Sequence, residues 1–186
     1  ETAILPRFRQ LQTADIQEKA PGDIVTIADK EAERIIFAGL AALLPGATII
    51  GEEAAADAPD LLARIADDTV WVVDPLDGTG NFAAGSETFA VMVALLRHGH
   101  PILSIILQPH GRHIYSAELG GGAFRNGIRI NTAQEMPSAK HRRGGVLTRF
   151  APPGTAAQIT QHLRGWTEQL PGLVCAGIEY PSIAAG

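Results

Sequence analysis

The apolar positions of residues 26–46 recur at the spacing of an amphipathic helix. They are Ala32, Ile35, Ile36, Phe37, Leu40, Leu43 and Leu44. Thr26 or Asp29 can cap the start of this helix, and Pro45-Gly46 stops it. Shorter helices are predicted over residues 7–19 and 58–67.

Short runs typical of strands surround these helices. Residues 47–50 form one, and residues 69–73 form another with so little polar alternation that we expect it to be buried on both faces. Three more runs, 89–97, 102–108 and 113–117, are separated by glycine, proline and histidine. Because short turns between consecutive strands mean antiparallel pairing, the pattern predicts a largely antiparallel sheet and not a βαβ repeat.

A polar stretch over residues 131–143 divides the chain. We expect an N-terminal α+β domain over residues 1–133, a linker over 134–143, and the beginning of a smaller α/β domain over 144–186. The second part should hold a strand at 145–148, a helix at about 155–170, a strand at 173–176 and the start of another helix. We expect this domain to continue beyond Gly186.

Composition excludes several classes of function. The chain has 186 residues, of which 46% are hydrophobic and 19% charged, as in globular proteins. Its formal net charge of −5 gives no electrostatic case for a nucleic-acid polymer or an anionic membrane. The longest apolar run, residues 89–96, has the length of a strand and not of a membrane span. Cys175 is the single cysteine, which suits a reducing compartment and predicts a cytoplasmic location.

Two acidic loops each follow an apolar strand. They are Gly51-Glu52-Glu53 and Asp74-Pro75-Leu76-Asp77-Gly78. If Glu52, Asp74 and Asp77 converge, each like-charge pair about 4 Å apart costs roughly 4 kcal/mol at an effective dielectric of 20. A divalent cation removes that cost, and all-oxygen ligands favour Mg²⁺, Mn²⁺ or Ca²⁺ over zinc.

The second loop also has the residues of an anion-binding turn. Pro75 stiffens it, and Gly78, Thr79 and Gly80 offer backbone N–H groups to a phosphate. A bare D-P-x-D-G string is equally typical of a type I turn capped by aspartates. A metal site beside an anion-binding turn predicts phosphate chemistry.

Other signals have simpler interpretations. The spacing of Gly78, Gly80 and Gly85 does not match the GxGxxG of a dinucleotide loop. The pairs His98-Gly99-His100 and His110 with His113 fall at predicted turns, where exposed histidines are common. Trp71 is expected in the core, and Glu53 is interpreted as a solvated loop charge.

The string WVVDPLDGTGNF, residues 71–82, resembles the signature of the inositol monophosphatase family. This family lies within the lithium-sensitive, metal-dependent phosphatase superfamily that includes fructose-1,6-bisphosphatases. Three further motifs match in order: DIVTIAD at 23–29, IGEE at 50–53 and YSAELGGGAFRN at 115–126. The resemblance implies a layered α/β (α+β) sandwich, with a largely antiparallel N-terminal sheet, flanking helices and a smaller C-terminal α/β domain.

The resemblance also implies roles for individual residues. Glu52, Asp74, Asp77 and the carbonyl of Leu76 would bind two or three Mg²⁺ ions, with Mn²⁺ as a possible substitute. Thr79, paired with Asp29, would position the attacking water, and Glu52 would share in catalysis. Gly78, Thr79 and Ala176 would lie against substrate. Members of the family are commonly homodimers.

One family feature does not match. The third metal-binding aspartate belongs to a W-D-x-A-A-G motif, and the tail Tyr180–Gly186 has Ser182 in the corresponding place. Residues 174–186 fit an earlier family segment better, so we expect the aspartate beyond Gly186.

The leading hypothesis is an Mg²⁺-dependent phosphomonoesterase that hydrolyses small phosphorylated metabolites such as inositol monophosphates. Histidinol-phosphate, 3′-nucleotide and sugar-bisphosphate phosphatases of the same family are alternatives. A non-catalytic binder of phosphate ligands on the same fold is the alternative from another class.

Overall fold

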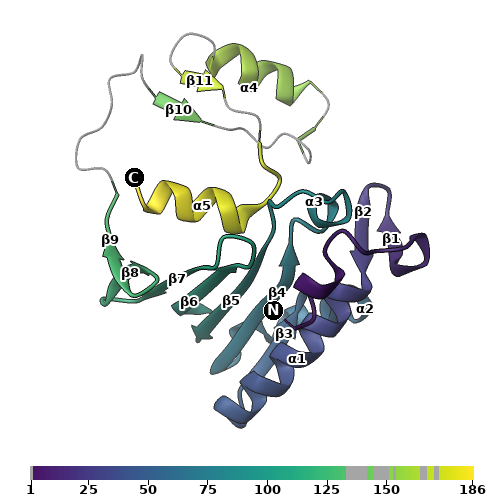
Figure 1. Cartoon of the computed structure of the whole chain (residues 1–186). Coiled ribbons are helices and arrows are strands. Elements are labelled where there is room, and N and C mark those ends of the chain that lie inside the picture. The colour runs from purple at the N-terminus through teal and green to yellow at the C-terminus, as the bar shows by residue number, and fades with distance from the viewer. Residues whose placement is uncertain (1, 133–141, 145–150, 153, 164–166, 170–171) are drawn as a thin grey trace.

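A computed structural model describes the chain except residues 1, 133–141, 145–150, 153, 164–166 and 170–171 (Figure 1). Its largest element is a seven-stranded sheet in the order β3-β4-β5-β6-β7-β8-β9. The strands are β3 (Thr48–Gly51), β4 (Thr69–Asp77), β5 (Ala90–Arg97), β6 (His100–Gln108), β7 (His113–Glu118), β8 (Gly122–Arg125) and β9 (Ile128–Ile130).

The sheet is a meander with one parallel pair. Every neighbouring pair from β4 to β9 is antiparallel, as the turn signals predict, whereas β3 and β4 run parallel. The connection between β3 and β4 contains α2 (Glu52–Asp57) and a 3₁₀ helix, η3 (Pro59–Ala66), where a short helix is predicted. Because β3 and β4 are parallel and adjacent, their carboxyl-terminal ends lie side by side at the same end of the sheet.

Two helices cover opposite faces of this sheet. On one face, Ala32 of α1 (Ile27–Leu43) belongs to the same buried cluster as Val91 of β5. On the other, Gly177 of α5 (Ala176–Ala184) lies against Ala90 and Met92 of β5. Because successive residues of a strand point to opposite faces, the two helices form the outer layers of a sandwich. The predicted layered α/β fold is therefore confirmed.

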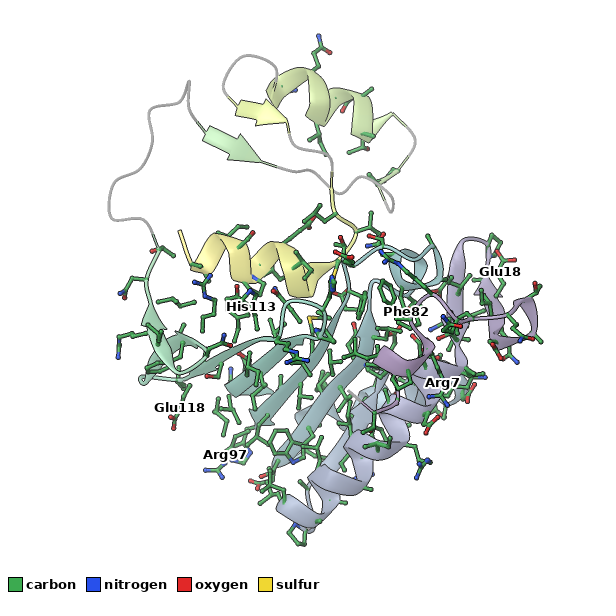
Figure 2. All side chains as sticks on the ribbon, in the orientation of Figure 1. Arg7, Glu18, Phe82, Arg97, His113 and Glu118 are labelled. Atoms are coloured by element: carbon green, nitrogen blue, oxygen red, sulfur yellow. The ribbon has the colours of Figure 1, made fainter. Side chains whose placement is uncertain are left out.

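The core beneath α1 contains an aromatic cluster. The rings of Phe82 and Phe89 meet edge to face, 5.1 Å between centroids, and Phe8 packs on both at 5.6 and 5.1 Å. Figure 2 shows Phe82 in the interior, whereas Arg97 and Glu118 project from the sheet into solvent. This cluster ties the N-terminal segment to the elements that flank the second acidic loop.

The helix predicted from residue 26 is confirmed, and both of its candidate caps are used. Thr26 is the N-cap, Asp29 completes a capping box with it, and Leu44 follows the last turn. The apolar face is not buried along its whole length, since Ile35 is 38% and Leu43 71% exposed. Trp71 is buried in β4, as expected.

The helix predicted over residues 7–19 is wrong. The segment forms two 3₁₀ turns, η1 (Leu5–Arg7) and η2 (Thr13–Asp15), and then β1 (Ile16–Ala20), which pairs antiparallel with β2 (Asp23–Thr26). Gly22, at a φ of +77°, supplies the turn between these strands. The pairing of β1 with β2 outweighs the weak helical pattern of this segment.

The second part of the chain also departs from prediction. β10 (Arg142–Gly144) pairs parallel with β11 (Thr167–Gln169), and α4 (Thr155–Leu163) lies between them in sequence. β10 thus falls at the end of the predicted linker. The helix predicted to residue 170 is wrong at Thr167–Gln169, which form β11. The strand predicted at 145–148 lies outside the described residues.

The strand predicted at residues 173–176 is also wrong. Val174 has a φ of +53°, which no extended strand accommodates, and α5 begins at Ala176.

The division into two domains stays a prediction. α5, from the second part, contacts β5 and β6 of the large sheet. Among the helices of the described part, none is long and apolar enough to span a bilayer.

The predicted turn positions are confirmed for His98 and His110, whereas His100 and His113 are the first residues of β6 and β7. His98 Nε2 lies 3.2 Å from Asp68 Oδ1, and His110 Nε2 lies 2.9 Å from Glu87 Oε2, all at the surface. Antiparallel β5 follows the Gly78 turn, so the dinucleotide loop is absent from this described segment, as expected.

Truncation of the aromatic core should destabilise the protein strongly. Phe89→Ala removes a fully buried ring, so we expect the free energy of unfolding to fall by about 3–5 kcal/mol. Leu119→Ala is the control, because Leu119 is 75% exposed and its loss should change stability by less than about 0.5 kcal/mol. Urea denaturation measures both, and equal effects would contradict the packing described here.

Candidate active site

The two acidic loops meet because β3 and β4 are parallel and adjacent. Gly51 of β3 pairs with Val73 of β4. The residues that follow them, Glu52 and Asp74, therefore lie side by side at the carboxyl-terminal end of the two strands. Sequence patterns indicate each loop separately, and the parallel pairing is what places their carboxylates together.

A β-bulge turns Asp74 and Asp77 to the same side. Asp74 pairs with Met92 and Asp77 with Ala90, so two residues of β4 oppose the single Val91 of β5. Residues three apart in a regular strand would face opposite ways. Since Met92 and Ala90 share a face, the extra residue brings both aspartates onto that face. Pro75, which has no N–H to donate, suits the bulge.

These side chains line an open cavity of about 400 Å³. Its lining residues are Gly22, Asp23, Ile24, Glu52, Asp74, Leu76, Asp77, Gly78, Thr79, Gly80, Asn81 and Val174. Seven residues predicted for the site from sequence are among them, whereas Asp29 and Ala176 are not. Asp29 lies behind Thr79, and Ala176 lies between two residues that contact Asp77.

Glycine is required at position 78. Its φ is +84°, and a Cβ there would lie 2.8 Å from the carbonyl oxygen of Thr88. This conformation lets the chain leave β4 and enter the short helix α3 (Thr79–Ala83) directly beside the aspartates.

Thr79 and Asp29 form the predicted pair. The hydroxyl of Thr79 lies 2.9 Å from Asp29 Oδ1 and 2.9 Å from the carbonyl oxygen of Leu76, so its single proton has two acceptors. The other oxygen of Asp29 accepts from the N–H and the hydroxyl of Thr26, at 2.8 and 2.5 Å. Burial raises the pKa of Asp29, and these hydrogen bonds oppose the rise.

Lys19, from β1, holds the first acidic loop. Its Nζ lies 3.1 Å from a carboxylate oxygen of Glu52 and 3.1 Å from one of Glu53. Burial acts to lower the pKa of Lys19, but the two carboxylates outweigh it and the pKa rises. Sequence reasoning missed this contact because residues 7–19 were predicted to be helical.

The interpretation of Glu53 as a solvated charge is wrong. It is 7% exposed and lies in α2, against Lys19. Burial raises its pKa to about 7, although the lysine acts in the opposite direction. Glu53 therefore helps to hold Lys19 beside Glu52.

Asp74 and Asp77 have different surroundings. Burial, followed by the charges of Glu52 and Asp77, raises the pKa of Asp74 to about 8. Asp77 Oδ2 accepts the N–H of Gly177 at 2.6 Å and lies 3.1 Å from Cys175 Sγ. Burial, with the Asp77 carboxylate second, raises the pKa of the Cys175 thiol. Asp77 thus joins the cavity to the first turn of α5.

The donor set matches a hard divalent cation. Three carboxylates and the carbonyl of Leu76 are oxygen ligands of the kind that Mg²⁺ prefers. In the described part of the chain, no three His, Cys, Asp or Glu side chains are already gathered as a metal cluster. Glu52 is bound to Lys19 and Asp77 to Gly177 instead. The residues fit an ion, provided that Glu52 exchanges its lysine partner for it.

Two further elements of the site were not predicted. Asn81 Nδ2 donates to the carbonyl oxygens of Thr88 at 2.9 Å and Leu173 at 2.8 Å, which ties α3 to the segment before α5. Gly22 of the β1–β2 turn and Asp23 and Ile24 of β2 also line the cavity. Ser182 donates to the Glu179 carbonyl within α5 and is not part of the described cavity lining.

Removal of the Thr79 hydroxyl should leave a buried carboxylate with one donor fewer. We expect Thr79→Val to lower the free energy of unfolding by about 1–3 kcal/mol, because Asp29 is fully buried. Thr79→Ser keeps the hydroxyl and should recover most of that loss. Urea denaturation of both variants tests this, and similar stabilities for valine and serine would contradict the proposed bond.

Comparison with known proteins agrees with this geometry. The family model described as "Inositol monophosphatase family" matches residues 2–186. An inositol-1-monophosphatase from Rhizobium meliloti is 40% identical over 182 residues, 96% of this chain and 66% of that protein. One from Mesorhizobium japonicum is 42% identical over 127 residues, 68% of this chain and 46% of that protein.

Solved structures agree as well. The extragenic suppressor protein suhB from Bartonella henselae superposes with a TM-score of 0.80 at 26% identity, covering 100% of this chain and 69% of that one. The chain spans about half to two thirds of the length of the two curated relatives above. By the match of its whole described fold and of residues 2–186, this chain belongs to the inositol monophosphatase family.

Proposed function

We propose that the protein is an Mg²⁺-dependent phosphomonoesterase that hydrolyses small phosphorylated metabolites of the inositol monophosphate type. The observation that carries the proposal is the convergence of Glu52, Asp74 and Asp77 on one cavity, beside the Thr79–Asp29 pair. A solvent-open, oxygen-rich cavity of this kind suits a charged phosphate ester better than an apolar ligand.

The metal-binding residues of the proposal are Glu52, Asp74, Asp77 and the carbonyl of Leu76. When bound, two or three Mg²⁺ ions, or Mn²⁺ in their place, would neutralise charge on the phosphate and the leaving oxygen and lower the pKa of a water. The chain's own contribution is to hold these oxygens rigidly, through the β4 bulge and the first turn of α2.

The Thr79–Asp29 pair orients the nucleophile in this proposal. With its proton donated to Asp29 Oδ1, Thr79 Oγ1 keeps lone pairs that accept a hydrogen from a water in the cavity. The oxygen of that water is then directed away from Thr79, toward the phosphorus. The proposal assigns Glu52, also in the cavity wall, to take the proton of that water.

Substrate contacts are assigned to the turn after β4 and to α5. The backbone N–H groups of Gly78 and Thr79 belong to the first turn of α3, where N–H groups have no carbonyl partner within the helix. They would bind phosphate oxygens. Ala176 would meet the substrate from the start of α5, which Asp77 holds through Gly177.

The proposal extends to the class of substrate and no finer. Histidinol phosphate, 3′-nucleotides and sugar bisphosphates are alternatives to inositol monophosphates, and a non-catalytic phosphate binder is the second candidate function. The pairing of Glu52 with Lys19 favours the binder, because the lysine neutralises the carboxylate without a metal. Cytoplasmic location and a homodimer stay predictions.

Phosphate release by the full-length protein, with Mg²⁺ and a panel of phosphate monoesters, tests the proposal. We expect Mg²⁺-dependent turnover that lithium inhibits and that Asp74→Asn lowers by about 10³-fold. Asp68→Asn removes a surface charge and should retain full activity. No release from any ester would contradict the enzyme and leave the binder as the better account.

Metal binding should also stabilise the fold. A cation that binds only the native state at 100 times its Kd adds about 2.7 kcal/mol to the free energy of unfolding. We expect Mn²⁺ to raise the melting temperature of the parent chain, and Asp77→Asn to reduce that rise. If Mn²⁺ raises both melting temperatures equally, the ion binds elsewhere.

A further inference from the structure

Glu33 is a buried carboxylate that the proposed chemistry does not use. It lies on α1 one turn after Asp29 and is 8% exposed. Its two oxygens accept separate backbone N–H groups at the start of α2: Oε2 from Glu53 at 3.0 Å and Oε1 from Ala54 at 3.1 Å.

These bonds replace the cap that α2 lacks. The N-cap residue is Gly51, which has no side chain to accept the first N–H groups of the helix. Glu33 accepts them from another helix, and its negative charge complements the positive end of α2. Glu52, the first residue of α2, immediately precedes Glu53, whose N–H is one of the two bonded groups.

Close packing fixes the Glu33 carboxylate in this place. A Cβ on Gly51 would lie 2.1 Å from Glu33 Oε2 and 2.8 Å from Phe37 Cζ. Any larger residue at position 51 would therefore push the carboxylate away from α2. The glycine of the Gly51-Glu52 step is needed for this approach, although its own φ of −105° is ordinary.

α1 thus supports two segments of the cavity at once. Asp29 reaches Thr79 and, four residues later on the same face, Glu33 reaches the first turn of α2. We propose that Glu33 is a positioning residue that fixes Glu52 relative to the Thr79–Asp29 pair. This inference rests on the proposed metal-dependent function.

A glutamine in place of Glu33 would break half of the arrangement. It keeps one acceptor oxygen but presents an NH₂ group to the second backbone N–H, so one of the two bonds is lost. Loss of groups that orient a metal ligand typically lowers metal affinity 10–100-fold. Asp60→Asn is the control, because it removes a charge from the exposed first turn of η3 without touching the first turn of α2.

Calorimetric titration of the chain with Mn²⁺ alone, and amide hydrogen exchange read at Glu53 and Ala54, test the proposal. We expect Glu33→Gln to weaken Mn²⁺ binding at least about 10-fold and to speed exchange at the amide that loses its acceptor. Asp60→Asn should leave both readouts at the parent values.

Gly51→Ala is the second variant, since it displaces the carboxylate without removing it. If Glu33→Gln does not unfold cooperatively, weakened binding and faster exchange in Gly51→Ala support the proposal, and parent values overturn it. Parent-like affinity and exchange in a folded Glu33→Gln would overturn the inference alone. If the parent chain binds no Mn²⁺, the proposed function falls and the inference falls with it.

Discussion

Mutual repulsion among Glu52, Asp74 and Asp77 is the constraint around which this structure is organised. Burial, followed by the charges of Glu52 and Asp77, raises the pKa of Asp74 to about 8, which shows that the ionised form is disfavoured here. Three interactions offset this repulsion. Lys19 forms an ion pair with Glu52, the Gly177 N–H donates to Asp77, and the Leu76 N–H donates to Asp74 at 3.1 Å. Groups from elements distant in sequence therefore compensate the charges of one cavity.

This arrangement explains why the supporting groups come from so many elements. β1 supplies the ammonium group of Lys19, and the first turn of α5 supplies the N–H of Gly177. α1 supplies the buried carboxylates of Asp29 and Glu33, which hold Thr79 and the first turn of α2. A cluster of like charges opposes folding, as functional sites commonly do. The aromatic core of Phe8, Phe82 and Phe89, packed beside α3, contributes the apolar burial that offsets such a cost.

The parts of the fold that sequence predicts well are those set by local pattern. The α1 helix, with Thr26 and Asp29 at its start, follows from apolar spacing and a capping box, and the antiparallel meander follows from turn residues. The residues of the second acidic loop follow from their motif, although the bulge that aligns Asp74 with Asp77 does not. Its register depends on which residues of β5 they face, and no local pattern encodes that.

The misses have a common physical cause, which is long-range pairing. β1 is a strand because β2 is beside it, and the wrong helix there hid Lys19. Glu53 is buried because Lys19 and Glu33 cover it, whereas its neighbours in sequence suggest an exposed loop. The start of α5 was mispredicted because Val174 adopts a left-handed conformation, and valine is a residue type that does not indicate one.

The most direct test of the account is to locate Mn²⁺ by its anomalous scattering in crystals grown with Mn²⁺ and phosphate. The account predicts ions within about 2.0–2.6 Å of carboxylate oxygens of Glu52, Asp74 and Asp77, with Lys19 displaced from Glu52. Ions bound elsewhere, or a Lys19–Glu52 bond that persists at saturating Mn²⁺, would contradict it.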